Sequence, residues 1–380
     1  MKYYKNMNRR DFLTLSATGI IGLGASSFPL SLFAGGKRDK SYSLIILGDT
    51  HFDADPPSIY HSLYNEPDEG RNKAHLSEFT RNGEMWKDRC PRLLRRASQL
   101  IQDDTRMVLQ MGDLIQGDCG SGEVHRKMLA DALDRMKSET QGLPFVTVVG
   151  NHDIRGVDAR STYDQYMPAR MSEELNKTIT KPTFGFNIGE DAFIVIDFNS
   201  PDDAEIERLL DETKGARHTF IMTHGPVFPA DITNCRWIFH GGASEAETEA
   251  RRHFRQAFAR RNAIVLCGHI HQTDFLDWYG DSGRITQMTM SSVWTSEKQK
   301  QYSVRSEGAA DYGMLRERRR LNGEDLKDER ALFDEYRPGI RQHINSSSQG
   351  CYKLNVNGKH VTIDFYGGDS QEISQRFTIK

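Results

Sequence analysis

The sequence predicts a layered α/β protein. Two observations carry this prediction: short apolar runs typical of strands alternate with helix-like segments, and a side chain able to bind a metal follows nearly every predicted strand. A third observation, a group of β-like runs near the C-terminus, indicates a second sheet. With 380 residues the chain is long enough for one large α/β domain with insertions, or for two modest domains.

The first half of the predicted domain, which we place at 40–295, contains three strands. The first is expected at 42–47. Residues 52–85 are rich in Pro, Asn, Asp, Glu and Arg without a clear period, so we expect a long surface loop there. From Trp86 onward, apolar residues recur at helical spacing and predict a helix before a second strand at 107–111. A helix over about 122–137 and a strand at 145–149 follow.

The second half continues the alternation. Strands are expected at 193–198, 219–222, 263–267 and 285–290, with helices at 203–210 and 245–260. Residues 296–348 are charged and favour helix, and Arg316, Arg318, Arg319 and Arg320 are interleaved with acidic residues. We interpret this segment as a solvated helical insertion rather than a phosphate- or nucleic-acid-binding patch. Asn357-Gly358 between two apolar runs predicts a hairpin, so residues 350–380 are expected to close the domain.

The N-terminus has the features of an export signal. Lys2 and Lys5 precede Arg9-Arg10-Asp11-Phe12-Leu13, which resembles the twin-arginine motif, and a mildly apolar stretch runs to Ala34. We therefore expect a signal peptide at 1–34, recognition by the twin-arginine translocation machinery, and a periplasmic or otherwise extracytoplasmic bacterial protein with no stable membrane span when mature. The alternative is an uncleaved membrane anchor, since about 20 residues suffice to span a bilayer.

Composition excludes few classes of protein. The formal net charge of −3 gives no reason to expect nucleic-acid binding through bulk electrostatics. The five cysteines include no C-x-x-C pair, and their odd number argues against a disulfide scaffold, although one or two bridges stay open in an oxidising compartment.

Five short segments supply side chains suited to two metal ions. They are Asp49-Thr50-His51, Gly112-Asp113, Gly150-Asn151-His152-Asp153, His224-Gly225 and Gly268-His269-Ile270-His271. Nearly every one of these segments follows directly after a predicted strand. Mixed His, Asp and Asn ligands suit Mn, Fe or Zn better than Mg or Ca. Two such ions, about 3.5–4 Å apart, hold a phosphoryl group and activate a bridging water as hydroxide, and a carboxylate is the ligand able to bridge them.

The assembled pattern resembles the calcineurin-like metallophosphoesterase superfamily, from about residue 42 to residue 290 together with the closing hairpin. The resemblance implies two mixed β-sheets packed as a sandwich with flanking helices, a four-layer αββα arrangement. It also implies that one metal is bound by Asp49, His51, Asp113 and His271. The second metal would be bound by Asp113, Asn151, His224 and His269, with Asp113 as the bridge. His152 would be the catalytic residue near the substrate phosphate, as a proton donor or a stabiliser of charge.

One position departs from two well-known subfamilies. Three residues after Asp113, purple acid phosphatases carry a metal-binding Tyr and Ser/Thr protein phosphatases an Asp that orients the catalytic His, whereas this chain has Gln116. The pattern is more similar to the cyclic-nucleotide phosphodiesterase-like branch. The sequence then leaves the identity of the residue that orients His152 undecided, and Asp118 and Asp153 are the candidates.

Substrate selection is expected to fall to the loops. Arg71 and Arg81, with Lys73 and Arg89, could bind a phosphate or could form surface ion pairs. Phe228, Trp237 and Phe239 could stack on a ring of the substrate, but we favour packing under the loop. His61 and His75 could face the site; we interpret them and the remaining histidines outside the motifs as surface or hydrogen-bonded residues.

The sequence thus predicts an exported, metal-dependent hydrolase of small phosphate esters, with a slight preference for phosphodiesters. A phosphomonoesterase of the same fold, a non-catalytic metal- or phosphate-binding protein and a nuclease are the alternatives.

Overall fold

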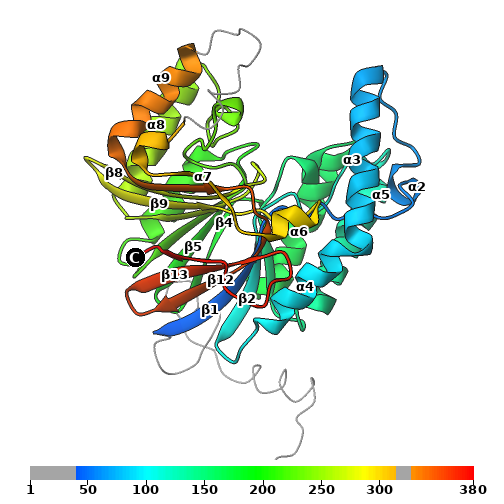
Figure 1. The fold of residues 1–380 in the computed structure, drawn as a ribbon, viewed down its shortest axis with the longest axis horizontal. Coiled ribbons are helices and arrows are strands. Elements are labelled where there is room, and N and C mark those ends of the chain that lie inside the picture. The colour runs from blue at the N-terminus through cyan, green and yellow to red at the C-terminus, as the bar shows by residue number, and fades with distance from the viewer. Residues whose placement is uncertain (1–39, 314–326) are drawn as a thin grey trace, which may run out of the picture. The chain divides into compact units, whose positions relative to one another are not determined.

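Two mixed β-sheets form the centre of the computed structural model, which describes residues 40–313 and 327–380 (Figure 1). The six-stranded sheet has the order β14-β13-β12-β1-β2-β3. Its strands are β1 (Ser41–Leu47), β2 (Thr105–Gln110), β3 (Phe145–Thr147), β12 (Gly350–Asn357), β13 (His360–Gly367) and β14 (Gln375–Thr378). Strands β1, β2 and β3 run parallel. Their C-terminal ends therefore meet at one edge of the sheet.

The eight-stranded sheet has the order β10-β11-β8-β9-β7-β6-β5-β4. Its strands are β4 (Phe184–Ile188), β5 (Asp191–Ile196), β6 (Thr219–Thr223), β7 (Ile264–Cys267), β8 (Thr273–Gly280), β9 (Gly283–Thr289), β10 (Val304–Glu307) and β11 (Ile340–Ser346). Strands β5, β6, β7 and β9 run parallel. A parallel bridge between Asp49 and Ser291 joins the residues that follow β1 and β9, so the C-terminal ends of both parallel sets meet.

The core divides along the faces of the sheets. In β5, Phe193 and Val195 belong to the large cluster that also contains the six-stranded sheet, whereas Ile194 and Ile196 belong to a second cluster. This alternation is the period of a strand buried on both faces. Helices α4 (Arg89–Gln99), α5 (Gly122–Glu139) and α6 (Ala159–Leu175) pack in the first cluster, and α7 (Asp203–Glu212), α8 (Glu245–Ala259) and α9 (Lys327–Tyr336) in the second. The predicted four-layer αββα fold is confirmed.

The segment 52–85 is not the long loop that we expected. It contains α2 (Ser58–His61) and most of α3 (Glu69–Lys87), whose first turn is capped by the Asp68 carboxylate accepting from the Arg71 amide. The buried residues of α3 all lie in its second half: Phe79, Asn82, Gly83, Met85 and Trp86. Because the first half buries nothing and Asn82 and Gly83 interrupt the apolar residues of the second half, the hydrophobic period is too short to predict a helix.

The late part of the chain also differs from expectation. Within the described part of 296–348, α9 is helical, but β10 and β11 extend the eight-stranded sheet. Strand β11 escapes detection because its buried side chains His343 and Asn345 are polar and bond to the Asp274 carboxylate. The predicted hairpin forms as β12 and β13, but it pairs with β1 in the six-stranded sheet rather than in a sheet of its own.

Two predictions lie outside the described residues: the export signal at 1–34 and the arginine cluster at 316–320. Across 40–313 and 327–380, no helix has the length and apolar character needed to cross a bilayer. All five cysteines are buried free thiols, so the structure contains none of the disulfides that the sequence left open.

Candidate metal centre

The strand ends bring the predicted ligands together in two groups that share one residue. Asp49, His51, Asp113 and His271 form the first group, and Asp113, His224 and His269 the second; within each, the potential ligand atoms lie within 4.8 Å of one another. These residues follow β1, β2, β6 and β7 in the chain. Asp113, common to both groups, occupies the place of a bridging carboxylate.

The backbone is strained at four of these residues. The φ angles of His51, Asp113, His269 and His271 are 42°, 50°, 72° and 50°, in the left-handed region that non-glycine residues avoid. Each costs about 1–2 kcal/mol. Gly150 has a matching steric role, because a Cβ there would lie 2.1 Å from the Asp113 amide nitrogen. This backbone strain lowers the stability of the fold, and it directs the four side chains to one point.

Hydrogen bonds orient the imidazoles. His224 donates from Nδ1 to the Met111 carbonyl at 2.7 Å, and His51 Nδ1 lies 3.1 Å from Gln116 Oε1. The remaining nitrogens face inward: His51 Nε2 is 3.0 Å from His271 Nε2, and His224 Nε2 is 3.1 Å from His269 Nδ1. Two nitrogen lone pairs at such distances repel unless a proton or a cation lies between them. Fixing one imidazole nitrogen outward is the usual way of presenting the other to a metal.

The buried carboxylates of the two ligand groups favour a positive charge between them. Burial opposes ionisation of Asp113, but His224, His152 and His51 hold its pKa well below the ordinary value. Burial also disfavours the charged form of His224, yet Asp113 and Asp49 raise its pKa to about 9. Burial, together with His224, lowers the pKa of His269 to about 3. The carboxylates thus favour the protonated form of His224, whereas His269 beside it stays neutral.

The residues present fit two metal ions. Oδ1 of the fully buried Asp49 accepts from the His269 amide at 2.9 Å, but its Oδ2 has no hydrogen-bond partner. A buried carboxylate oxygen without a partner is costly unless a cation satisfies it. Asn151 Oδ1 lies 3.2 Å from His224 Nε2 and brings the predicted amide ligand to the second group.

His152 is oriented by a backbone carbonyl. Its Nδ1 donates to the Gln116 carbonyl at 2.9 Å, and its Nε2 accepts from Arg155 Nη1 at 3.2 Å. The ring packs edge-on against His51, with centroids 4.4 Å apart. This arrangement leaves Nε2 as the atom that can exchange a proton.

The two carboxylates that we considered as orienting groups have other partners. Asp153 accepts from the Ile115 and Gly150 amides at 3.1 and 2.8 Å and holds the motif loop closed. Asp118 forms an ion pair with Arg155 Nη2 at 2.5 Å. Neither candidate carboxylate contacts His152 directly, and Asp118 reaches it only through Arg155.

Arg155 is the functional residue that the sequence reasoning missed. Besides His152 and Asp118, it pairs with Glu78 Oε2 on α3 at 3.3 Å. Its position three residues after His152 was an available signal. Arg71 and Arg81, which we considered as phosphate ligands or as partners in surface ion pairs, are exposed on α3.

Gln116 connects the first ligand group to α3. Its Oε1 accepts from Asn82 Nδ2 at 2.5 Å, and its Nε2 donates to Glu78 Oε2 at 3.2 Å. Trp86 donates from Nε1 to the Thr50 and His51 carbonyls, both at 3.0 Å. Gln116 therefore links His51 to helix α3, which the sequence did not predict.

The profile of the family described as "Calcineurin-like phosphoesterase" matches residues 42–273, more than half of the chain. The chain belongs to this family. The predicted class of enzyme, a metal-dependent phosphoesterase, is confirmed at the level of the family, whose matched region includes every predicted ligand. No curated protein is significantly similar to this phosphoesterase.

Solved structures resemble this phosphoesterase at low identity. PhoD is 11% identical with a TM-score of 0.48, over 91% of this chain and 70% of PhoD. GAP50, the anchor in the inner membrane complex of Plasmodium, is 11% identical with a TM-score of 0.45, over 89% of this chain and 88% of GAP50. A predicted phosphoesterase from Streptococcus pneumoniae is 10% identical with a TM-score of 0.30, over 89% of this chain and 98% of that protein.

The other histidines of this phosphoesterase lie outside both ligand groups, as predicted. His61 bonds to both Asp53 carboxylate oxygens at 3.0 Å and stacks on Phe79. His75 bonds to Tyr64. His360 is exposed. The remaining histidines bond to backbone or carboxylate oxygens: His125, His218, His240, His253 and His343.

The aromatic residues after His224 separate into two kinds. Phe228 and Phe239 are buried in the second core cluster, as expected for packing. Trp237 is 55% exposed, with its ring centroid 5.4 Å from that of His269. For Trp237 the packing prediction is wrong, because its loop turns the ring away from the core that receives its neighbours.

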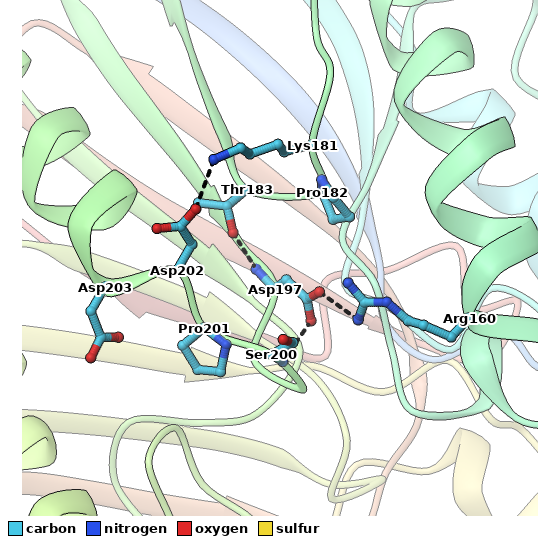
Figure 2. Close-up of a pocket in the computed structure, with 9 residues that line it drawn as sticks. All are labelled: Arg160, Lys181, Pro182, Thr183, Asp197, Ser200, Pro201, Asp202 and Asp203. Carbon is cyan, nitrogen blue, oxygen red and sulfur yellow. Dashed lines mark hydrogen bonds and ion pairs between the residues drawn. The ribbon is translucent and has the colours of Figure 1, made fainter.

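A hollow of about 500 Å³ lies at the end of β5 (Figure 2), and none of the residues that line it belongs to either ligand group. Its charges are paired: Arg160 Nη1 lies 2.7 Å from Asp197 Oδ2, and Lys181 Nζ lies 2.8 Å from Asp202 Oδ2. Asp197 also accepts from the Asn199 and Ser200 amides at 3.0 and 3.2 Å. These contacts brace the turn that carries Phe198.

Proposed function

We propose that this protein hydrolyses phosphate esters with two transition-metal ions held by the two ligand groups. The observation that carries the proposal is the sharing of Asp113 between the groups, beside an Asp49 oxygen that lacks a partner. The first ion would be held by Asp49, His51, Asp113 and His271, and the second by Asp113, Asn151, His224 and His269. When bound, such a pair of ions lowers the pKa of a water and neutralises phosphoryl charge. The His-rich donor set favours Mn, Fe or Zn.

His152 would move a proton at Nε2. The Gln116 carbonyl keeps the other ring hydrogen on Nδ1, so Nε2 faces the reacting group with its lone pair or its proton. Arg155, which now donates to Nε2, would turn its guanidinium toward a phosphoryl oxygen when a substrate is bound. Its present partners, Glu78 and Asp118, are carboxylates that a substrate anion can replace.

A phosphodiester is the preferred substrate. Gln116 replaces the Tyr or Asp that distinguishes two subfamilies, and this supports the cyclic-nucleotide phosphodiesterase-like branch. Arg155 already faces two carboxylates, and a singly charged diester meets less repulsion there than a doubly charged monoester.

The decisive experiment is a substrate panel with elemental analysis. Purified protein loaded with Mn, Zn or Fe would be assayed on 4-nitrophenyl phosphate, bis(4-nitrophenyl) phosphate, and 2′,3′- and 3′,5′-cyclic nucleotides. We expect two metals per chain and faster hydrolysis of diesters. Faster hydrolysis of the monoester would establish a phosphomonoesterase, and cleavage of DNA a nuclease. Two bound metals without turnover on any substrate would leave a non-catalytic binding protein.

We also propose that the mature enzyme lies outside the cytoplasm. The twin-arginine-like residues Arg9 and Arg10 support export by the translocation machinery for folded proteins, with cleavage near Ala34. Replacing both arginines with lysine should retain the protein in the cytoplasm of a bacterial host. Unchanged periplasmic activity would refute the twin-arginine route, and a mature form that still carries residues 1–34 in the membrane fraction would indicate the uncleaved anchor.

A further inference from the structure

We propose that Trp237 and Phe198 form a subsite for a planar ring on the ester group that stays attached to phosphorus. We call these two side chains the aromatic flank. This inference rests on the proposed function and narrows it, because the substrate becomes a phosphodiester with an aryl or nucleoside-like ring on its non-leaving side.

Trp237 is placed for contact with a ligand rather than with the core. It is 55% exposed, whereas the other three tryptophans, Trp86, Trp278 and Trp294, are buried at 9%, 8% and 0%. Its ring lies at 57° to that of His269, with centroids 5.4 Å apart. An exposed indole beside a candidate metal ligand offers a stacking surface at the entrance to the reaction centre.

Phe198 approaches the same histidine from β5. Its ring centroid is 5.2 Å from that of His269 and 5.7 Å from that of His224. The approach depends on Gly225, where a Cβ would lie 2.4 Å from Phe198 Cδ2. Figure 2 shows the ion pair between Arg160 and Asp197, the residue that precedes Phe198 in the chain. Phe198 is therefore held in place, which lowers the entropy cost of binding a ring.

The aromatic flank lies at one end of the ligand cluster, and His152 lies at the other. His152 packs on His51, which belongs only to the first group, whereas the flank packs on His269, which belongs only to the second. Asp113 stands between them as the shared member. A phosphoryl group at Asp113 with its leaving oxygen toward His152 directs its second ester substituent toward Trp237. A monoester has no such substituent.

Two substrates with the same leaving group isolate this contact. Methyl 4-nitrophenyl phosphate and phenyl 4-nitrophenyl phosphate both release nitrophenolate and differ only on the non-leaving side. Trp237→Ala should lower kcat/KM for the phenyl diester about 5- to 100-fold, mainly through KM, and change the methyl diester by less than about twofold. Trp237→Phe should retain most of the preference. Equal loss on both substrates, or none on either, overturns the proposal.

The matched control is Tyr279→Ala, another exposed aromatic residue. Tyr279 is 42% exposed and lies near the end of β8, which runs antiparallel to β9 and so leads away from the ligand cluster. Its removal should leave both substrates unaffected. Metal content and far-ultraviolet circular dichroism should match between the variants, so that a folding defect is recognised.

A binding measurement tests the flank without turnover. Methyl(phenyl)phosphinate and dimethylphosphinate carry a diester-like charge and cannot be hydrolysed. The phenyl compound should quench the fluorescence of the metal-loaded wild type but not of Trp237→Phe, and should bind at least about fivefold more tightly than the dimethyl compound. Equal binding of both refutes the flank even if the enzyme is active. Quenching by the phenyl compound in a protein inactive on every ester supports the flank and refutes the proposed function.

Discussion

His224 makes the stability of the metal-free protein depend on pH in a defined window. Burial lowers the pKa of this imidazole, but the Asp113 carboxylate, 3.2 Å away, and Asp49 raise it from the ordinary 6.5 to about 9. The folded protein therefore holds a proton that the unfolded chain releases. This stabilisation is complete below pH 6.5 and is lost as the pH rises through about 9. At about 1.4 kcal/mol per pH unit it amounts to roughly 3 kcal/mol.

Metal loading should show the opposite trend. A ligand imidazole must lose its proton to the solvent, and at pH 7 the protonated form of His224 exceeds the neutral form ~100-fold. The apparent affinity for Zn²⁺ or Mn²⁺ is therefore expected to rise ~100-fold between pH 7 and pH 9 and then to level off. Asp153, whose pKa burial and Asp113 raise to about 7, completes its titration at the lower end of this range.

Thermal unfolding of chelator-treated protein between pH 7.5 and 9 measures the first effect, and competition with a chelator dye measures the second. Calorimetry in two buffers of different ionisation enthalpy counts the protons released. His224→Gln should abolish both dependences, whereas His360→Gln, at an exposed histidine, should leave them intact. A Tm of the metal-free protein that stays constant or rises with pH would refute the charge assigned to His224.

Asp113→Asn should remove both metals and reduce turnover to background, because a neutral amide bridges poorly; two retained metals at full rate would contradict the shared-ligand assignment. His152→Ala should keep the metals and lower turnover roughly 10²–10⁴-fold, and wild-type turnover would exclude it as the proton-transfer residue. Arg155→Ala should lower kcat/KM about 10- to 100-fold, the loss of a charge-assisted bond to phosphate, with partial recovery in Arg155→Lys; an unchanged kcat/KM would leave Arg155 structural. Gly150→Ala should destabilise the fold by about 1–3 kcal/mol, since its Cβ would lie 2.1 Å from the Asp113 amide nitrogen, and an unchanged Tm would refute that steric argument.

The supporting contacts of the site were less predictable than its ligands. Helix α3 was missed because its first half buries no side chain, and because Asn82, which bonds to Gln116, stands among the buried residues of its second half. Such a helix carries only a short hydrophobic period. The Gln116 carbonyl that orients His152 was missed because every residue has a backbone carbonyl, so the sequence carries no signal for this contact.

The sequence by itself determined a layered α/β fold and the five motif segments, and the resemblance of these segments to the metallophosphoesterases implied the αββα arrangement and the ligand set. Parallel strands deliver the residues that follow them to one edge, so β1 and β2 bring Asp49 and Asp113 together, whereas His224 follows β6 in the other sheet. Only the tertiary structure decided that the C-terminal ends of the two sheets meet, where hairpin β12–β13 pairs, and that Trp237 faces solvent while Phe228 and Phe239 face the core. These outcomes depend on contacts between segments far apart in the chain, which neither periodicity nor motif spacing records.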